Sequence, residues 1–520
     1  MSGLKKLAGQ TAIYGVSTIF GRFLNVFLTF WLTYVFAADE FAVFSLAYAY
    51  VTFLNVIFTY GMETSYFRFV QNEKFRPDVY STSLLSIFLT TALFTAAMLY
   101  YAPQIAELWR IPNQPQFITW FAWIIALDTL AAIPFARLRH EGRPVKYAAI
   151  KLGNIIINVA TAYFFIKICP ALLAKNPDSF LLMVYNPELG IGYTFIANLV
   201  ASAATLLFLS KELFSVRLRF NKELWIQMLQ YSWPLLLVGL GGMVNEVISR
   251  IMLDYRLPYS FERNKTEVGI FNANWKIAAL VNMFILVFRT GAEPFFFSEA
   301  KKMDARKTYA RVMKIFVLVS CVVFLGVSLY ADTIWGQYFI GVKNHPEYAE
   351  GHGTIPIIAL AYVFLGIYYN LTIWYKLTDK TIYGAYITLA GAVITIVLNY
   401  LTIPYFGYWG SAWATLICYG FMMIISYKQG QRHYPIPYAW KKLTAYVVIS
   451  LILYGIYFGV RQLTDNTLVG IAVATLLLAA FLWFIGLVER KEFSRLPLIG
   501  KLYRTTPAPS IAPTTPGGRA

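Results

Sequence analysis

Charged residues are scarce in this sequence of 520 residues. They make up 13% of the chain, whereas soluble domains carry about 25%. This small amount of charge cannot cover the surface of a water-soluble protein of this size. The composition therefore excludes a large soluble enzyme or regulator. Hydrophobic residues take the place of charge at 58% of the chain, in apolar runs long enough to cross a membrane.

Cysteine and histidine are rare as well. The three cysteines, Cys169, Cys321 and Cys418, fall in separate apolar segments, and the four histidines lie in expected loops. This spacing offers neither a disulfide framework nor a metal site, so we expect no metal and no cofactor. The loops between the apolar runs are too short to hold a soluble domain.

Apolar segments recur along the whole length. Each has about the 20 residues that a helix needs to cross the hydrocarbon core, and their continuous hydrophobicity favours helices over the short alternating strands of a barrel. We therefore predict an all-α integral membrane protein with about 14 transmembrane helices. The first segment is too long for a signal peptide and is expected to be retained. The approximate limits are 11–36, 42–68, 81–101, 116–137, 147–167, 189–210, 226–253, 268–297, 312–331, 354–375, 382–403, 409–427, 443–461 and 467–488.

Basic residues alternate from loop to loop. Most of the 44 Lys and Arg residues fall at the two ends of the chain and in every second loop. Because basic loops are retained in the cytoplasm, both termini are expected to be cytoplasmic. The same asymmetry explains most of the net charge of +18 without a nucleic-acid partner. The opposite loops hold only Arg110, Lys167, Lys175, Arg250, Arg256, Arg263, Lys265, Lys343 and Arg461.

Two segments of the first half are echoed in the second half. The second span resembles the eighth, with Glu40 aligned to Glu267, and the sixth resembles the twelfth, with Gly190 aligned to Gly407. Six spans are an even number, so the halves would insert with the same polarity as parallel repeats, with a site between them.

This pattern predicts two pseudo-symmetric lobes of six helices plus two further C-terminal helices. The expected units are an N-terminal lobe over 1–215, a C-terminal lobe over 216–430, two additional spans within 431–490, and a Pro/Thr-rich cytoplasmic tail over 491–520 that is expected to be disordered.

Basic side chains inside the spans are the main candidates for a binding site, because charge at bilayer depth is costly and usually functional. Arg22 lies about 16 Å along the first span at 1.5 Å per residue, and Lys276 lies near the middle of the eighth. Asp128 could neutralise Arg22 across the first lobe, whereas Lys151 sits where it can reach the membrane surface. The candidate cavity cations are Arg22, Lys276, Arg289 and Arg250.

Acidic residues in the spans are candidates for ion coupling or for neutralising these cations. Glu246 and Arg250 are four residues apart, as are Arg289 and Glu293, so each pair can meet on one helix face. Lys276 and Arg289 point about 140° apart on a straight helix, so one narrow cavity cannot take both. The candidate acids are Asp128, Glu246, Glu63 and Glu293.

The seventh span contains residues that can bend a helix. Pro234 is followed by Gly239, Gly241 and Gly242. Proline kinks a helix, and glycines allow bending or close helix packing. We expect a hinge at Pro234, Gly241 and Gly242, although close packing alone would also explain the glycines.

A cation-lined cavity between two lobes suits an anion. Arg and Lys both bind phosphate, and Arg does so with a bidentate fork. The residues therefore indicate a carrier of a bulky anionic amphiphile. A carrier of drug cations would favour an acidic or neutral cavity, which Arg22 and Lys276 disfavour. A membrane glycan polymerase or ligase is also disfavoured, because the outward loops contain no nucleophile–base constellation.

Four stretches of the sequence resemble a known family. They are KKLAGQTAIYGVSTIFGRFLNVFLTFWLTYVFAADEFAVFSL near the start, YGMETSYFRF, VGIFNANWKIAALVNMF with the following AEPFFFSEA, and GYWGSAWATLICYG. They resemble Wzx-type oligosaccharide (polysaccharide) flippases of the multidrug/oligosaccharidyl-lipid/polysaccharide exporter superfamily. That superfamily also includes lipid II flippases and multidrug extrusion carriers.

The resemblance implies a transporter rather than an enzyme. It implies fourteen helices in a V of two lobes, in a bacterial cytoplasmic (inner) membrane, with alternating access. The implied substrate is an undecaprenyl-diphosphate-linked oligosaccharide moved outward for surface polysaccharide, such as O-antigen, capsule or exopolysaccharide. The alternatives are a lipid II flippase or a multidrug cation antiporter. The expected partners also include membrane lipid, a coupled proton or sodium ion, and the polysaccharide polymerase machinery.

Overall fold

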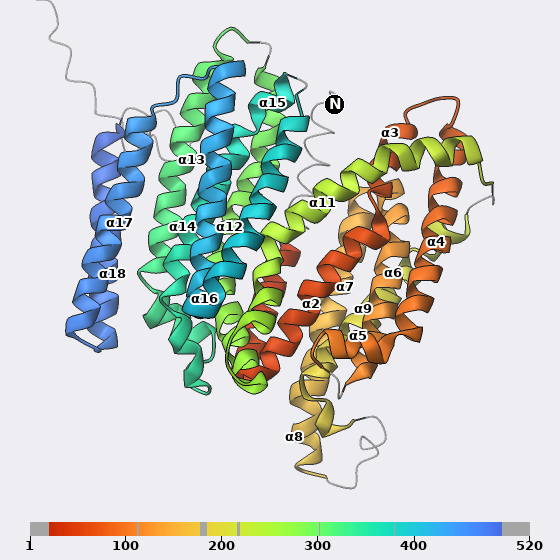
Figure 1. Cartoon of the computed structure of the whole chain (residues 1–520), viewed down its shortest axis with the longest axis horizontal. Helices are drawn as coiled ribbons and strands as arrows, with labels where there is room; N and C mark the ends of the chain where they lie inside the picture. The colour runs from red at the N-terminus through yellow and green to blue at the C-terminus, as the bar shows by residue number, and fades with distance from the viewer. Residues whose placement is uncertain are drawn as a thin grey trace, which may run out of the picture.

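The computed structural model is a bundle of long helices, and the part of the chain that it describes contains no strand (Figure 1). It describes residues 20–111, 114–176, 185–215, 219–300, 302–378 and 380–490. The predicted all-α membrane architecture is therefore confirmed. The expected disordered tail over 491–520 and the first part of the first span lie outside the described residues.

The helices follow one another with short connections. A helix over 20–35 precedes α2. The N-terminal half continues with α2 (Ala38–Thr59), α3 (Met62–Phe69), α4 (Arg76–Tyr100), α5 (Ala102–Leu108), α6 (Pro115–His140), α7 (Pro144–Tyr163), the π-helix η1 (Phe164–Ile168), α8 (Cys169–Leu173), the 3₁₀ segment η3 (Pro187–Gly192), α9 (Tyr193–Phe208) and α10 (Ser210–Phe214). The rest comprises α11 (Lys222–Arg256), α12 (Phe261–Glu299), α13 (Ala305–Ser328), the π-helix η4 (Ala331–Phe339), the 3₁₀ segment η5 (Pro346–Gly351), α14 (Thr354–Leu371), α15 (Ile373–Leu377), α16 (Ile382–His433), α17 (Trp440–Leu463) and α18 (Thr467–Val488).

Several helices begin where the sequence supplies a start signal. Proline occupies the first or second position of α4, α6 and α7, where its missing N–H would have no helical partner. Asn221 caps α11 by accepting a hydrogen bond from the N–H of Leu224, and Asn466 caps α18 in the same way.

Helix α16 is a hairpin of two antiparallel legs. Its backbone leaves the helical region at Gly407, where φ is 56° and ψ is −138°. The side chains of Asn399 and Ser411, on opposite sides of that break, form a hydrogen bond of 2.7 Å, and the Cys418 thiol contacts the carbonyl of Gly391. The described residues contain 12 helices long and apolar enough to span a membrane. This number counts α16 once and leaves out the helix over 20–35. Counting the second leg of α16 and that helix separately gives about the 14 spans that the sequence predicts.

The glycine echo found in the sequence is present in the backbone. Gly190 has φ 45° and ψ −118°, close to the values at Gly407. Both glycines occupy the turn between the last two helices of their half. This region of φ and ψ is open essentially to glycine alone, so the two halves share an unusual local geometry.

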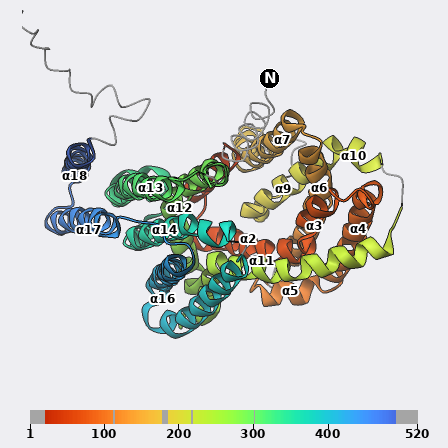
Figure 2. The ribbon, with the colours of Figure 1, turned by 90° about the horizontal axis from the view of Figure 1, so that it is seen from above.

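The long helices form two groups with α2 and α11 crossing between them (Figure 1). One group holds α4, α6, α7 and α9, and the other holds α12, α13, α14 and α16; Figure 2 shows the same division from above. Helix α11 packs on α3 near its start and on α16 further along. Helices α17 and α18 lie at the outer side of α13.

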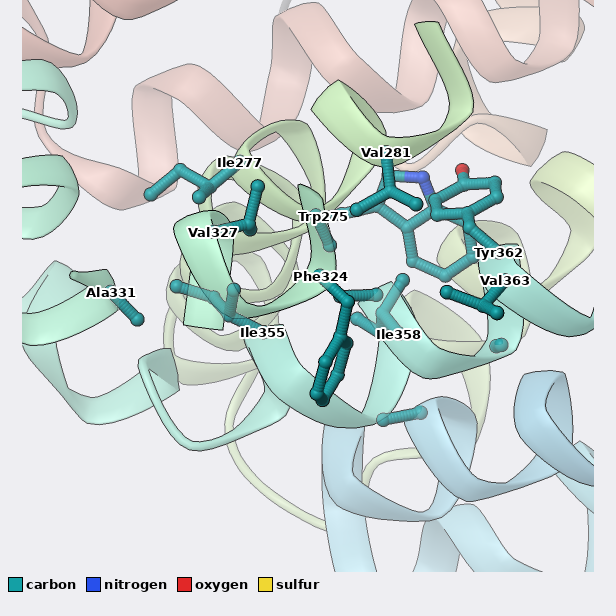
Figure 3. Close-up of a cluster of buried hydrophobic side chains, with 14 of the residues drawn as sticks. Trp275, Ile277, Val281, Phe324, Val327, Ala331, Ile355, Ile358, Tyr362 and Val363 are labelled. Carbon is teal, nitrogen blue, oxygen red and sulfur yellow. The ribbon is translucent and has the colours of Figure 1, made fainter. Parts of the chain in front are cut away.

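The largest hydrophobic core belongs to the second group. Figure 3 shows Trp275 of α12 packed among side chains from α13 and α14, including Phe324, Ile358 and Tyr362. The rings of Trp275 and Tyr362 meet edge to face at 6.0 Å between centroids. Burial of such aromatic side chains stabilises the group that holds the candidate site.

We use two names for the ends of the bundle. The basic end carries the connections α3–α4, α6–α7, α10–α11, α12–α13 and α15–α16, where the lysines and arginines gather, and it lies at the top of Figure 1. The sealed end, opposite to it, carries the connections α5–α6, α11–α12 and α13–α14.

Candidate functional site

A polar cavity lies in the second group of helices. Its volume is about 220 Å³, and its walls come from α11, α12, α14, α15 and both legs of α16. It runs from Lys376, near the basic end of α15, to Asn245 and Glu246 in the middle of α11. The lining residues are Gly242, Asn245, Glu246, Asn282, Arg289, Leu365, Tyr368, Tyr369, Thr372, Tyr375, Lys376, Thr388, Tyr419 and Met422.

Arg289 is the candidate cation that lines this cavity. Its guanidinium stacks on the ring of Tyr369 at 4.5 Å from the centroid. Both residues also line a smaller neighbouring cavity. Stacking holds the guanidinium plane in place while its N–H groups remain directed outward from the ring edge.

Arg250 and Lys276 lie behind the cavity wall. Arg250 stacks over the ring of Trp275 at 5.4 Å, and its Nε is buried without a hydrogen-bond partner. Lys276 is half-buried and within electrostatic range of Arg250 and Glu246. It is absent from the lining of the cavity that Arg289 faces, as their angular separation on the helix predicts.

Glu246 and Arg250 do not form the ion pair that their spacing allows. No ion pair joins these two described residues, because Arg250 turns toward Trp275 on α12. Glu246 is exposed and lines the cavity. It therefore places a negative charge beside the cations without neutralising any of them by direct contact.

Arg22 approaches the same region from the first described helix. It is exposed, and it makes no ion pair or hydrogen bond with a described residue. It lies within electrostatic range of Tyr369, as do Arg289 and Glu246. Arg289 contacts the Tyr369 ring, whereas Arg22 and Glu246 act on it through space.

The other candidate acids lie elsewhere. Asp128 accepts a hydrogen bond of 2.7 Å from Ser202 inside the first group, and its neighbouring cation is Lys151 rather than Arg22. Glu63 pairs with Arg139 near the basic end. The side chain of Glu293 lies outside the described residues.

The candidate hinge residues have different surroundings. Gly242 lines the cavity and has open space where a Cβ would stand. Gly241 packs closely against Leu389 of α16. Pro234 lies inside α11, which continues as one helix from Lys222 to Arg256. Packing accounts for Gly241, whereas no contact requires Gly242 to be glycine.

Sequence reasoning missed the tyrosines of the cavity. Tyr368, Tyr369, Tyr375 and Tyr419 line it together with Lys376. Four of these five residues fall in the run LGIYYNLTIWYKL over 365–377. A cluster of tyrosines followed by a lysine at the end of an apolar span was the available signal, since such side chains combine an apolar body with a polar tip.

Close contacts between the two halves close the opposite end. Gly269 of α12 lies so near the carbonyl of Ala38 that a Cβ there would overlap it. Tyr348 donates a hydrogen bond to the carbonyl of Phe36, and Glu347 accepts one from the N–H of Ala38. These contacts join the start of α2 to η5 and α12.

A buried ionic group strengthens the same closure. Asp254 at the end of α11 is fully buried and forms an ion pair of 2.9 Å with Lys265 of α12. Arg110, from the connection between α5 and α6, donates to the carbonyl of Asp254, and Tyr255 donates to the carbonyl of Leu108. A conformation that opened this end would have to break these bonds.

Comparison with solved structures places this fold among known transporters. The structure titled lipid II flippase MurJ, inward closed conformation, matches with a TM-score of 0.72 at 14% identity and covers 92% of this chain and 99% of that one. An inward-facing multidrug resistance MATE family transporter of the MOP superfamily matches with a TM-score of 0.63 at 13% identity, over 82% and 95%.

The chain has the fold of these transporters. The MatE family model matches residues 261–401, which span α12 to the first leg of α16. An outward-facing MATE family transporter matches with a lower TM-score of 0.55 at 14% identity, over 86% and 99%. No curated relative matches the chain. The protein is a multi-pass membrane protein, and its structural neighbours include a lipid II flippase and MATE family transporters.

Proposed function

We propose that this protein is a flippase for an undecaprenyl-diphosphate-linked oligosaccharide, which it moves from the cytoplasmic to the periplasmic leaflet. The observation that supports the proposal is the guanidinium of Arg289, stacked on Tyr369 in the wall of a polar cavity in the second group of helices, with Arg22 within electrostatic range of the same ring. A diphosphate is a dianionic group that arginine recognises by bidentate hydrogen bonds. The product would serve the synthesis of surface polysaccharide.

The proposed orientation follows from the distribution of charge. The basic end would face the cytoplasm of a bacterium with both termini there, because Lys and Arg are retained on that side. The cavity reaches toward the basic end at Lys376, while Gly269 and Asp254 close the opposite end. The structure would then correspond to an inward-facing state of an alternating-access cycle. The two lobes, divided near residue 215, would be the units that move.

Tyrosines in the cavity support a substrate with sugar rings. The faces of Tyr368, Tyr369, Tyr375 and Tyr419 offer apolar surface with hydroxyl groups at their edges. That combination suits a sugar, which has apolar C–H faces and polar rims. The positive charge would hold the diphosphate and the aromatic wall would contact the glycan.

Two alternatives rest on specific observations. The match to lipid II flippase MurJ favours a diphosphate lipid with a different sugar and peptide. Exposure of Glu246 in the cavity favours a drug cation, or a proton or sodium ion coupled to transport. The cations beside Glu246 weigh against a drug cation, because like charges repel in a low-dielectric site.

Transport by purified protein in proteoliposomes tests the proposal. A lipid-linked oligosaccharide, lipid II and a cationic dye would be offered separately, and outward movement measured for each. We expect the lipid-linked oligosaccharide to move fastest. Transport of only the dye would overturn the proposal, and transport of only lipid II would select the first alternative.

Substitutions in the cavity sharpen the same test. We expect Arg289→Ala to reduce transport about tenfold or more, since one charge-assisted hydrogen bond contributes about 1.5–3 kcal/mol. Arg256→Ala is the matched control, because Arg256 stacks on Tyr400 at 4.1 Å outside the cavity. Equal transport by Arg289→Ala and Arg256→Ala would remove Arg289 from the mechanism.

A further inference from the structure

A second polar cavity lies at the basic end of the first group of helices. Its volume is about 440 Å³, twice that of the cavity around Tyr369. It lies between the end of α3, the start of α4, the end of α6 and the connection from α10 to α11. The lining residues are Tyr66, Val70, Arg76, Pro77, Tyr80, Ser81, Arg137, His140, Glu141, Ser215 and Arg219.

One arginine of this cavity is held in place by its neighbours. The Nε of Arg137 donates a hydrogen bond of 2.7 Å to Glu141, and one of its terminal nitrogens donates to the hydroxyl of Ser215. Its guanidinium also stacks on Tyr80 at 4.6 Å. A guanidinium fixed on three sides presents its remaining N–H groups in a defined direction.

The acids near the cavity are already engaged. Glu141 pairs with Arg137 and Arg143, and the buried Glu212 pairs with Arg143 and Lys146. Although burial opposes it, the hydrogen bond and charge of Arg137 lower the pKa of Glu141 below its ordinary value. Asp78 is bound to the side-chain amide of Asn221. Each of these carboxylates therefore already has a partner of its own.

Two further arginines line the cavity without an acidic partner among the described residues. Arg76 uses its Nε to donate to the carbonyl of Val70 and leaves its terminal nitrogens unengaged by any described group. Arg219 contributes only its backbone to the hydrogen bonds with Ser81. Both side chains are exposed. The cavity thus has a positive charge that the described protein residues do not neutralise.

We propose that this cavity, formed by Arg76, Arg137 and Arg219, is a second anion site that binds a phosphate-bearing group at the basic end of the bundle. Three guanidinium groups around one cavity match the oxygens of a phosphate or diphosphate. The start of α4 at Arg76 adds the positive end of a helix dipole. Tyr66, Val70 and Pro77 give the cavity an apolar side, which suits a phosphate attached to a lipid at the membrane surface.

Two kinds of ligand carry the phosphate group that this cavity would bind. One is the headgroup of an anionic phospholipid, and the other is a soluble phosphate or pyrophosphate. The site is separate from the cavity around Tyr369, because the two share no lining residue. Binding there is measured without any transport and does not depend on the substrate proposed above.

Binding to the full-length protein in detergent provides the test. Pyrophosphate would be titrated against the wild type, against the double variant Arg76→Gln and Arg219→Gln, and against a control double variant, Lys428→Gln and Arg432→Gln. The control removes two exposed charges from the same end of the molecule, at α16. We expect the first double variant to bind pyrophosphate at least about tenfold more weakly, and the control to bind like the wild type.

Reconstitution identifies the source of the phosphate. Protein in vesicles of phosphatidylcholine would be compared with protein in vesicles of equal parts phosphatidylcholine and phosphatidylglycerol. If phosphatidylglycerol displaces pyrophosphate, the site takes a lipid headgroup; if it does not, the site takes a soluble anion. Equal weakening in both double variants, or no pyrophosphate binding by the wild type, would overturn the proposal.

Discussion

The two groups of helices share a backbone feature but differ in their interiors. Tyr48 of α2 accepts a hydrogen bond of 2.8 Å from Asn198 and is surrounded by phenylalanine rings. The alignment that pairs Glu40 with Glu267 also pairs Tyr48 with Trp275 of α12, and Trp275 has Arg250 stacked on its ring. Both halves thus have an aromatic residue at this position, and a cation lies beside it only in the second half.

Under the proposed function, this difference indicates where substrate specificity would reside. Gly190 and Gly407 keep the same backbone geometry, so the arrangement of helices is symmetrical at that point. The polar cavity is not symmetrical, since its walls come from the second half of the chain. Packing constraints act on both groups of helices, whereas the proposed anionic substrate would need cations in only one place.

The largest expected effect concerns the place where the two lobes touch. Gly269 contacts the backbone of Ala38, so Gly269→Val would push α12 away from α2. Overpacking by side chains costs about 1–3 kcal/mol, and a backbone carbonyl cannot turn aside as a side chain can. We expect transport to fall by more than about tenfold, and hydrogen exchange of residues 38–42 and 265–272 to accelerate.

The matched control is on the same helix. Gly291 of α12 has open space where a Cβ would stand, so Gly291→Val should leave both transport and exchange near wild-type values. If Gly269→Val retained slow exchange at the sealed end, the contact between the lobes would not be what closes it.

The next effect tests whether the two halves are equivalent. Gly190→Ala and Gly407→Ala should each destabilise the protein by about 2 kcal/mol, because the backbone at both sites is unfavourable for a residue with a Cβ. Steric contact adds little, since the added Cβ would meet its nearest neighbours at 3.8 Å and 3.7 Å. Thermal unfolding in detergent measures both variants, with Gly455→Ala, in open space on α17, as the control.

Similar losses at the two positions would support the repeat. A loss at only one of them would show that the matching backbone angles arise from different local needs. Gly455→Ala should be neutral or slightly stabilising, because alanine favours a helix more than glycine does.

The fold could be predicted further than the site. The apolar runs predicted the helices, because only helices and closed barrels satisfy the hydrogen-bonding groups of the backbone in lipid. The alignment of Gly190 with Gly407 identified two turns with similar backbone angles. The hairpin of α16 also followed from the two adjacent apolar runs. These features depend on the local sequence and the thickness of the bilayer.

The site could be predicted only in part. Arg289 lines the cavity and Arg22 lies within electrostatic range of Tyr369 in its wall, and their role in binding stays a prediction. Their spacing allowed Glu246 and Arg250 to meet, but spacing on one helix cannot show that Arg250 turns toward Trp275 of the next helix. The tyrosines of α14 were missed for a similar reason: an aromatic residue in a span faces core, lipid or cavity according to tertiary packing.

The smallest expected effect concerns helices α17 and α18, which extend only the second lobe. Glu489, just after α18, accepts a hydrogen bond of 2.7 Å from Lys314 of α13 and is also bonded to Tyr446 of α17. Although burial opposes it, the hydrogen bonds and charge of these partners lower the pKa of Glu489 below its ordinary value. The ionised carboxylate therefore helps to hold both helices against the lobe.

The sign of the pH dependence follows from that lowered pKa. A carboxyl with a lowered pKa stabilises the folded state fully above its unfolded pKa of about 4.3, and the contribution disappears as the pH falls through the lower folded pKa. Glu489→Gln should lower stability by about 1 kcal/mol at neutral pH, a modest value because the site lies at the end of a span. The unfolding temperatures of the wild type and the variant should therefore converge as the pH falls below the pKa of the carboxyl in the unfolded chain. A constant difference down to strongly acidic pH would mean that Glu489 acts through packing rather than through charge.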